Sequence, residues 1–203
     1  MQTLSKDPFN LLITGVGGQG NVRMAEIIGD ALQQQGYLIT IGDTLGGAQR
    51  GGSVASHIRI SRETQYGPYI PEGHADIILG MEPLETLRML AKYGRPDVKT
   101  ITGIRPISSV DIFGRRANYP DLETVMAKIR EMSGQIWIID AVEEAFKLGN
   151  PVYANMILVG ALIGTCLLPL NLKSLEPVIR ETLGKEFAIN KKVLGKGIEL
   201  AQK

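Results

Sequence analysis

Two glycine-rich runs in the sequence have the residue types and spacing that suit anion binding. The first, GVGGQG, satisfies the pattern G-x-G-x-x-G and lies between an apolar run that predicts a strand and a stretch that predicts a helix. Glycines there permit a tight turn and let a phosphate approach the N–H groups at the start of the helix. The residues that would make this contact are Gly15, Gly17, Gly18, Gln19 and Gly20.

An acidic residue follows this run at the spacing of a dinucleotide site. Asp43 stands at the end of the second predicted strand, 23 positions after Gly20, and an acidic side chain about 20 residues on would hold a ribose hydroxyl. Glycine turns at the first strand of such sheets also serve packing without any nucleotide. The residues alone therefore leave open whether the turn binds a dinucleotide or only packs.

The second run surrounds an arginine with glycines at the carboxyl end of a predicted strand. Open α/β sheets bind ligands at that edge, and glycines let the backbone come close to a ligand or a partner. The guanidinium of Arg50 can fork onto a carboxylate or a phosphate, although an arginine in a flexible loop can also be merely solvated. The candidate binding residues are Gln49, Arg50, Gly51, Gly52 and Ser53.

Cysteine and histidine are too few for metal or redox chemistry. Cys166 is the only cysteine of the sequence, which excludes an intrachain disulfide and a four-cysteine iron–sulfur cluster held by this chain alone. His57 and His74 are the only histidines, and neither has the spacing of a metal site or a nucleophile triad. We therefore predict no metal site and no catalytic residue in this chain, and a structural role for His57.

Charge and hydropathy exclude several classes of partner. Lys and Arg number 22 and Asp and Glu 21, and a net charge of +1 gives no field that would draw nucleic acid or anionic lipid. The start of the chain, residues 1–8, is polar and holds no targeting segment, so we expect a cytoplasmic protein. The longest uncharged run, 151–171, approaches the length of a membrane span. Because Asn155, Thr165 and Cys166 interrupt it, we interpret it as a buried helix.

Apolar periodicity predicts a sheet whose strands alternate with helices. Strands are predicted at 9–14, 37–42, 53–60, 76–80, 98–102 and 135–140, with an extended piece at 104–107. Helices are predicted at 21–35, 82–92, 121–132, 143–148, 153–168, 174–183 and 189–202. This order indicates an α/β fold: a Rossmann-like, mostly parallel sheet with helices on both faces. We expect one domain over 1–203, with a helical C-terminal portion at about 141–203.

Three segments together resemble a known family. GVGGQG, then GGAQRGGSVASHIRIS, then YIPEGHADIILGMEPLETLR are similar to the small subunit of indolepyruvate:ferredoxin oxidoreductase and to the gamma subunits of 2-oxoacid:ferredoxin oxidoreductases. The likeness spans about residues 10–92, and AQRGGSV favours the indolepyruvate branch over others; enzymes of other aryl 2-oxoacids look similar. It implies oxidative decarboxylation of a 2-oxoacid with coenzyme A to an acyl-CoA, carbon dioxide and reduced ferredoxin.

The resemblance also implies where the cofactors lie. Thiamine diphosphate, Mg²⁺ and [4Fe–4S] clusters would belong to a large partner subunit in a hetero-oligomer that reduces ferredoxin, and coenzyme A would bind in the complex. By analogy, the GVGGQG turn and the Gln49–Ser53 loop face the partner's thiamine site or the coenzyme A path, with Arg50 as the anion contact. Glu82 would line the same cleft or cap its helix.

Two other functions remain open on the sequence alone. A free-standing NAD(P)-binding dehydrogenase would need a catalytic acid or base over the nicotinamide, and the sequence offers no evident second half for a substrate. A subunit that serves assembly only would use its glycines purely for packing.

Overall fold

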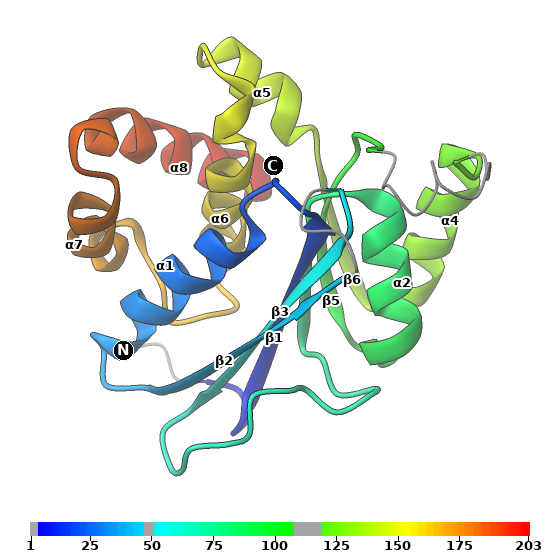
Figure 1. Ribbon diagram of the computed structural model, residues 1–203, viewed down its shortest axis with the longest axis horizontal. Helices are drawn as coiled ribbons and strands as arrows, with labels where there is room; N and C mark the ends of the chain where they lie inside the picture. Colours follow the sequence, from blue (N-terminus) through cyan, green and yellow to red (C-terminus); the bar gives the residue numbers. More distant parts are fainter. Residues whose placement is uncertain (1–3, 47–50, 108–118) are drawn as a thin grey trace.

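A computed structural model describes residues 4–46, 51–107 and 119–203 of the chain (Figure 1). Its strands and helices follow one another in a mixed order that becomes wholly helical after the sixth strand. The elements are β1 (Phe9–Val16), α1 (Asn21–Gln33), β2 (Leu38–Leu45), β3 (Ser53–Ser61), β4 (Ile77–Gly80), α2 (Pro83–Tyr93), β5 (Lys99–Gly103), α4 (Leu122–Met132), β6 (Gln135–Ile139), α5 (Ala141–Lys147), η1 (Pro151–Tyr153), α6 (Ala154–Gly164), α7 (Leu172–Leu183), η2 (Gly184–Glu186) and α8 (Phe187–Ala201).

The described strands form one six-stranded sheet in the order β2-β3-β1-β4-β5-β6. The strands β1, β4, β5 and β6 run parallel to one another. β3 is antiparallel to both of its neighbours, β1 and β2. The chain leaves β1 through α1, forms β2, and returns in a hairpin so that β3 fits between β2 and β1. The predicted α/β fold with a mostly parallel sheet and a helical C-terminal portion is confirmed. The antiparallel direction of β3 was not predicted.

Helices cover both faces of the sheet. Figure 1 shows α1, α6, α7 and α8 on one face and α2 and α4 on the other. The side chains of β1 alternate between two hydrophobic cores, as the period of two residues in a strand requires. Leu11 and Ile13 pack with the α1 and α6 side, and Leu12 packs with the α2 and α4 side, each with no exposed surface. β1 is therefore central to the fold, and the glycine turn that follows it starts from a rigid base.

The uncharged run at 151–171 folds back into the protein. Within it, α6 spans Ala154–Gly164, and nearly all its residues are buried, which confirms the buried helix. The helix is shorter than the predicted 153–168, because the chain turns at Cys166, whose φ is 55°. Within the described ranges, no helix combines the length and the apolar character that a membrane crossing requires.

Small residues let α6 and α8 approach closely. A Cβ added at Gly197 would lie 2.8 Å from the nitrogen of Ala161 and 2.8 Å from the Cα of Gly160. Gly195, two positions earlier on the same helix, has no heavy atom within 4 Å of such a Cβ. Gly197 is therefore closely packed against α6, whereas Gly195 on the same helix is not, so the two positions form a matched pair.

Gly197→Ala is expected to lower the free energy of unfolding by roughly 1–3 kcal/mol, because the added methyl forces the helices apart. Gly195→Ala should raise it by about 0.5–1 kcal/mol, since alanine favours the helix and meets no neighbour. Urea denaturation of the full chain measures both. Equal effects of the two variants would show that the α6–α8 contact is not tightly packed.

His57 lies in the middle of β3 and has no exposed surface. Its Nδ1 accepts the backbone N–H of Ile70 at 3.3 Å, and the rings of Tyr69 and Tyr93 stand edge-on to it at 5.4 and 5.1 Å. Beside it, the Arg59 guanidinium donates to the Tyr69 carbonyl at 2.9 Å. These contacts fasten the loop before β4 onto the β2–β3 hairpin.

The same surroundings disfavour a charged histidine. Burial, aided by the positive charge of Lys92, lowers the pKa of His57 from 6.5 to about 4, while Asp43 acts in the opposite direction. The neutral ring therefore stabilises the fold, and this contribution is complete above pH 6.5, the value for the unfolded chain. It is lost as the pH falls toward 4, where the unfolded chain binds a proton that the folded chain does not.

Between pH 6.5 and 4 the histidine component should lower the unfolding free energy by about 3 kcal/mol in total. His57→Gln removes this component, so its stability should depend less on pH over that window. Thermal unfolding at a series of pH values measures the difference. His74→Gln removes the chain's other histidine, from an exposed position, and should keep the wild-type dependence; a His57 variant that also kept it would contradict the argument.

Candidate functional site

The two glycine-rich runs meet at the carboxyl edge of β1. Because β3 runs antiparallel to β1, its first residue, Ser53, pairs with the last residue of β1, Val16. The N–H of Gly17 donates to the carbonyl of Gly52 at 2.8 Å, and the N–H of Gly51 donates to the carbonyl of Gly17 at 3.3 Å. The structure therefore brings together the predicted residues Gly17, Gly51, Gly52 and Ser53.

The residues of the first run have different tasks. A Cβ at Gly15 would lie 2.9 Å from the Cβ of Met81, and one at Gly20 would lie 2.5 Å from the Nδ2 of Asn155, so both glycines serve close packing. Gly18, with φ of 101°, has no heavy atom within 4 Å of its added Cβ. Gln19 folds back, and its Oε1 accepts the N–H of Val16 at 2.6 Å. Among Gly15, Gly18 and Gly20, it is Gly18 that has free space on its Cβ side for a ligand or a partner.

A shallow groove of about 500 Å³ runs beside the turn. Gly17, Gly18 and Gly20 line it together with the start of α1 and the side chains of Leu45 and Val54. Its lining combines the ion pair of Arg23 and Glu26 with Leu45, whose side chain is 65% exposed. This opening suits contact with another protein surface at least as well as contact with a phosphate.

Asp43 does not lie beside the glycine turn. It belongs to β2, which runs on to Leu45, and β3 separates β2 from β1. Its Oδ1 accepts the hydroxyl of Ser56 at 2.5 Å. In a dinucleotide fold the acidic residue sits on the strand next to the turn. The placement of Asp43 at the end of a strand was wrong, and the ribose contact has no support from the geometry.

Glu82 follows β4 at the same edge and is 1% exposed. Its carboxylate accepts the N–H of Glu85 at 2.9 Å, the N–H of Ile107 at 3.3 Å and the hydroxyl of Tyr119 at 2.5 Å. It is the N-cap of α2, so of its two predicted roles the capping contact is present in the structure. Burial raises the pKa of Glu82, and the hydrogen bond from Tyr119 opposes that rise.

Tyr119 connects this carboxylate to the start of α2. Its hydroxyl donates to Glu82 and accepts the N–H of Leu84 at 3.2 Å. Burial and the neighbouring carboxylate raise the pKa of Tyr119, so the phenol stays protonated. One buried carboxylate thereby joins the start of α2 to Ile107, in the segment after β5, and to Tyr119, shortly before α4.

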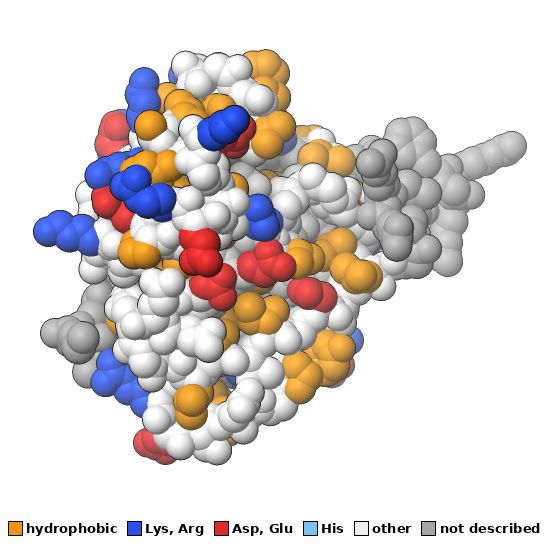
Figure 2. All heavy atoms as spheres, turned by 60° about the vertical axis from the view of Figure 1, so that its left-hand side comes forward, with side chains coloured by type: hydrophobic (Ala, Val, Ile, Leu, Met, Phe, Trp, Pro, Cys, Tyr) orange, Lys and Arg blue, Asp and Glu red, His pale blue; other side chains and the backbone are white. Residues whose placement is uncertain are grey.

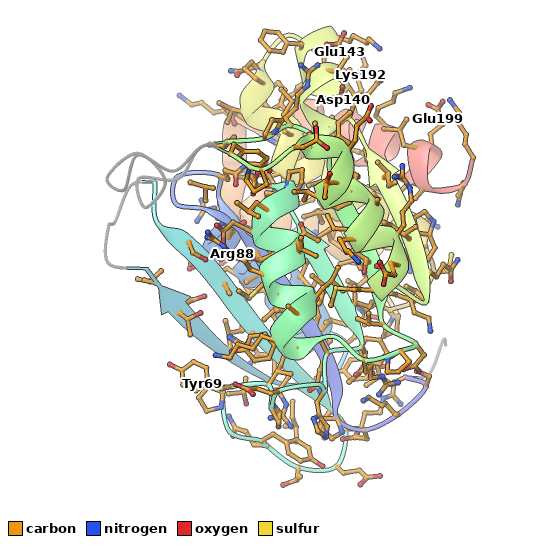
Figure 3. All side chains as sticks on the ribbon, turned by 90° about the vertical axis from the view of Figure 1, so that its right-hand side faces the viewer. Tyr69, Arg88, Asp140, Glu143, Lys192 and Glu199 are labelled. Carbon is orange, nitrogen blue, oxygen red and sulfur yellow. The ribbon has the colours of Figure 1, made fainter. Side chains whose placement is uncertain are left out.

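A second buried carboxylate, Glu85, was not predicted. It is 1% exposed; its Oε2 accepts the Ser53 hydroxyl at 2.6 Å and its Oε1 pairs with Arg88 at 2.6 Å. Figure 3 shows Arg88 on the side of α2 nearest the β2–β3 hairpin. Ser53 and Glu85 are 32 positions apart, so no local sequence pattern predicts their contact. The position of Glu85 in the first turn of a helix was the one signal of a polar role.

An exposed ion-pair group lies beyond β5 and β6. Arg105 pairs with Asp140 and with Glu143, both at 3.2 Å, and Figure 3 shows the two acids side by side at the start of α5. All three side chains are partly solvated, so the group adds little to stability.

The remaining predicted site residues, Gln49 and Arg50, lie outside the described residues, as does the pair Arg115 and Arg116. Within the described ranges, no group of three or more histidine, cysteine, aspartate or glutamate side chains is arranged to hold a metal ion. The described part of the site thus offers backbone amides, glycines and two internally paired carboxylates.

Tyr119→Phe is expected to lower the unfolding free energy by about 1–3 kcal/mol, because it leaves a buried carboxylate with one donor fewer. The same change in a Glu82→Gln background should cost less, since the neutral amide leaves no uncompensated charge. Chemical denaturation of the four members of this cycle measures the coupling, with Tyr153→Phe on η1 as the control. Strictly additive effects would show that the two side chains do not act together.

Comparison with known proteins supplies the family context. The sequence profile of the family described as pyruvate ferredoxin/flavodoxin oxidoreductase matches residues 10–200. A similar curated protein is the indolepyruvate oxidoreductase subunit IorB of Pyrococcus horikoshii, 36% identical over 196 residues, which cover 96% of this chain and 96% of the relative. The likeness therefore extends well beyond the glycine-rich motifs.

Solved structures share the fold. The 2-oxoglutarate:ferredoxin oxidoreductase of Magnetococcus marinus, solved with 2-oxoglutarate, coenzyme A and succinyl-CoA bound, matches with a TM-score of 0.76 and 19% identity, over 98% of this chain and 32% of the longer one. The pyruvate oxidoreductase subunit PORC of Thermotoga maritima matches with a TM-score of 0.66 and 20% identity, over 96% and 97%. The same fold thus occurs both as part of a longer chain and as a separate subunit.

Proposed function

The chain belongs to the pyruvate ferredoxin/flavodoxin oxidoreductase family, and from that premise we propose that it is the small subunit of a thiamine-dependent oxidoreductase for indolepyruvate or another aryl 2-oxoacid. In the reaction the substrate loses its carboxylate as carbon dioxide, the acyl group passes to the sulfur of coenzyme A, and ferredoxin accepts the electrons. The observation that carries this proposal is the likeness to an indolepyruvate oxidoreductase subunit along almost the full length of both chains.

The metal-ligating side chains of this chain are too few for an iron–sulfur cluster, so a partner would have to hold the clusters. A [4Fe–4S] cluster takes four cysteine ligands, and the sequence has only Cys166. Among the described residues, no group of three or more histidine, cysteine, aspartate or glutamate side chains lies together. We therefore assign the clusters, thiamine diphosphate and its Mg²⁺ to a large partner subunit, which would also deliver electrons to ferredoxin.

Exposed apolar side chains support a hetero-oligomer. Leu45 beside the glycine turn is 65% exposed, and Phe146 on α5 and Val152 on η1 are 61% and 70% exposed. Figure 2 shows hydrophobic side chains gathered at the top of the molecule, over α5 and η1. Large apolar residues that stay in water in the isolated chain gain stability when a second protein covers them.

The glycine turn and the Gln49–Ser53 loop would face the partner's thiamine site or the path of coenzyme A. The described parts of both runs, which include Gly17, Gly52 and Ser53, lie at the carboxyl edge of the parallel strands, where ligands bind in open α/β sheets. Arg50 is then the anion contact, for the substrate carboxylate or a coenzyme A phosphate. We place the complex in the cytoplasm and treat 1–203 as one domain.

The test is Arg50→Ala in the purified complex. The complex should assemble as before, while kcat/KM falls about 10–100-fold, the value of a charge-assisted hydrogen bond to an anion. The measurement is anaerobic dye reduction that depends on the 2-oxoacid and on coenzyme A. Lys192→Ala, on the exposed side of α8, is the matched loss of a cation and should leave the rate unchanged. Full activity of the Arg50 variant would mean that the chain serves assembly only.

Purification of the chain from its source under anaerobic conditions tests the partner. We expect a large, cysteine-rich, thiamine-binding subunit to copurify together with aryl 2-oxoacid activity. Recovery of the chain alone with bound NAD would instead favour a free-standing dehydrogenase.

A further inference from the structure

The second strand of the sheet, β2 (Leu38–Leu45), has a neighbour on one side only. Among the described strands it is the outermost, and it pairs with β3 alone (Figure 3). The two strands pair along the whole length of β2 without interruption. In such an antiparallel ladder, the N–H and C=O groups of successive residues point alternately toward the neighbour and away from it. Every second residue of β2 therefore presents both groups to the outside.

Two hydrogen bonds show which residues of β2 point outward. The N–H of Gly46 donates to the carbonyl of Ser53 at 2.7 Å, so every second residue counted back from Gly46 faces β3. On the other side of β3, the N–H of Gly17 donates to the carbonyl of Gly52 at 2.8 Å, which gives β3 the matching alternation. The outward backbone groups of β2 are therefore those of Ile39, Ile41, Asp43 and Leu45. We call these groups the open edge of β2.

The open edge lacks the short length, lysine, proline or bulge by which proteins usually prevent an edge strand from pairing with another chain. β2 has eight residues, none of them lysine or proline, and its register is unbroken. Its one charged side chain, Asp43, is bonded to the hydroxyl of Ser56 within the chain. By contrast, β6 at the other end of the sheet has only five residues. The open edge of β2 is therefore an unprotected surface for a further strand.

The size and position of the open edge restrict what can cover it. Apolar side chains lie at both ends of β2, where Leu38 is 42% and Leu45 is 65% exposed. Leu45 also lines the groove beside the glycine turn, so the open edge and the groove form one continuous surface. A stable interface buries roughly 1,200–2,000 Å² in total, which is more than pairing along one short strand provides. The occupant must therefore extend past the end of β2 onto the groove.

A second copy of this chain does not meet that requirement. A symmetric pair of copies joined through this edge must run antiparallel, because in a parallel pair of equal register N–H would face N–H. The Leu45 end of one copy would then lie beside the Leu38 end of the other, so the two grooves would be at opposite ends of the contact. The large partner subunit is placed over the glycine turn by the proposed function. A segment of that subunit can continue from the groove along β2.

We propose that an extended segment of the large partner subunit docks on the open edge of β2 as an added strand and continues into the groove beside the glycine turn. This inference rests on the proposed function, which supplies the partner. Backbone hydrogen bonds to Ile39, Ile41 and Asp43 give the contact its affinity, as in other cases of strand addition. The apolar side chains of Leu38 and Leu45 are covered at its two ends.

Amide hydrogen exchange, resolved residue by residue in the isolated chain and in the purified complex, tests the docking directly. The N–H groups of the open edge should exchange at least about 100-fold more slowly in the complex than in the isolated chain, because only the complex gives them acceptors. The N–H groups of Thr40, Gly42 and Thr44 point toward β3 and should exchange slowly in both samples. These three amides are the internal control for the fold of β2.

The outcomes of this experiment separate the two proposals. Fast exchange of the open edge in an assembled and active complex would overturn the docking and leave the proposed function intact. If no large subunit binds the chain at all, the proposed function fails and the docking fails with it. The experiment needs no substitution, so it does not depend on the folding of a variant.

A proline at position 45 removes one outward N–H and keeps the ladder with β3, since proline is tolerated on the open side of an edge strand. Leu45→Pro should therefore leave the melting temperature of the isolated chain close to that of the wild type. It should weaken binding to the large subunit about 10-fold more than Leu45→Ala, which loses the same side chain but keeps the N–H. Competition of each variant with the wild-type chain for assembly measures the difference. Equal incorporation of the two variants would contradict a strand at this edge.

Sedimentation of the isolated chain tests the alternative occupant. We expect a monomer at micromolar concentration, because the open edge alone is too small for a stable contact between two copies. A dimer that Leu45→Pro dissociates would instead assign the open edge to a second copy of this chain and overturn the proposal.

Discussion

The pairing of β3 with β1 is the constraint on which the site depends. In a purely parallel sheet the start of one strand and the end of its neighbour lie at opposite edges, so two loops of this kind would be separated by the length of a strand. Because β3 runs antiparallel, Ser53 sits beside Val16, and the two glycine-rich runs exchange backbone hydrogen bonds between Gly17, Gly51 and Gly52. These hydrogen bonds between Gly17, Gly51 and Gly52 couple the conformations of the two runs where they meet.

The same pairing separates the chain from the dinucleotide-binding proteins that its first motif resembles. A nucleotide site needs the glycine turn and the acidic residue on adjacent strands. Here β3 occupies the place next to β1 and moves Asp43 one strand further away, about 10 Å from β1 at the usual spacing of strands. At Gly20 the neighbouring space holds Asn155 of α6. The glycines thus allow two loops and a helix to pack closely together. The same sequence pattern is compatible with this packing and with nucleotide binding.

The sequence pattern predicted the secondary structure and the fold class far better than the contacts of the candidate site. Strands and helices follow from the period of apolar residues, which depends on neighbours a few positions away, and their order led to the α/β fold. The direction of β3 depends on a hairpin whose turn has no short, type-specific signature, so the pattern could not supply it. Glu85 was missed for the same reason: its partner Ser53 is remote in the sequence, and only the folded sheet brings the two together.

Two carboxylates, Glu82 and Glu85, are buried at the start of α2. A gain in stability alone does not explain why both positions hold a charged side chain. Replacing such groups with apolar ones is often neutral or stabilising for a protein, whereas losing one partner of a pair is costly. Glu82 joins the start of α2 to Ile107, in the segment after β5, and to Tyr119, and Glu85 joins α2 to Ser53 at the start of β3. Both acids thus connect the start of α2 to parts of the chain that are remote in the sequence. The contacts of both acids thus fix the positions of neighbouring segments, even where the buried charges themselves add little to stability.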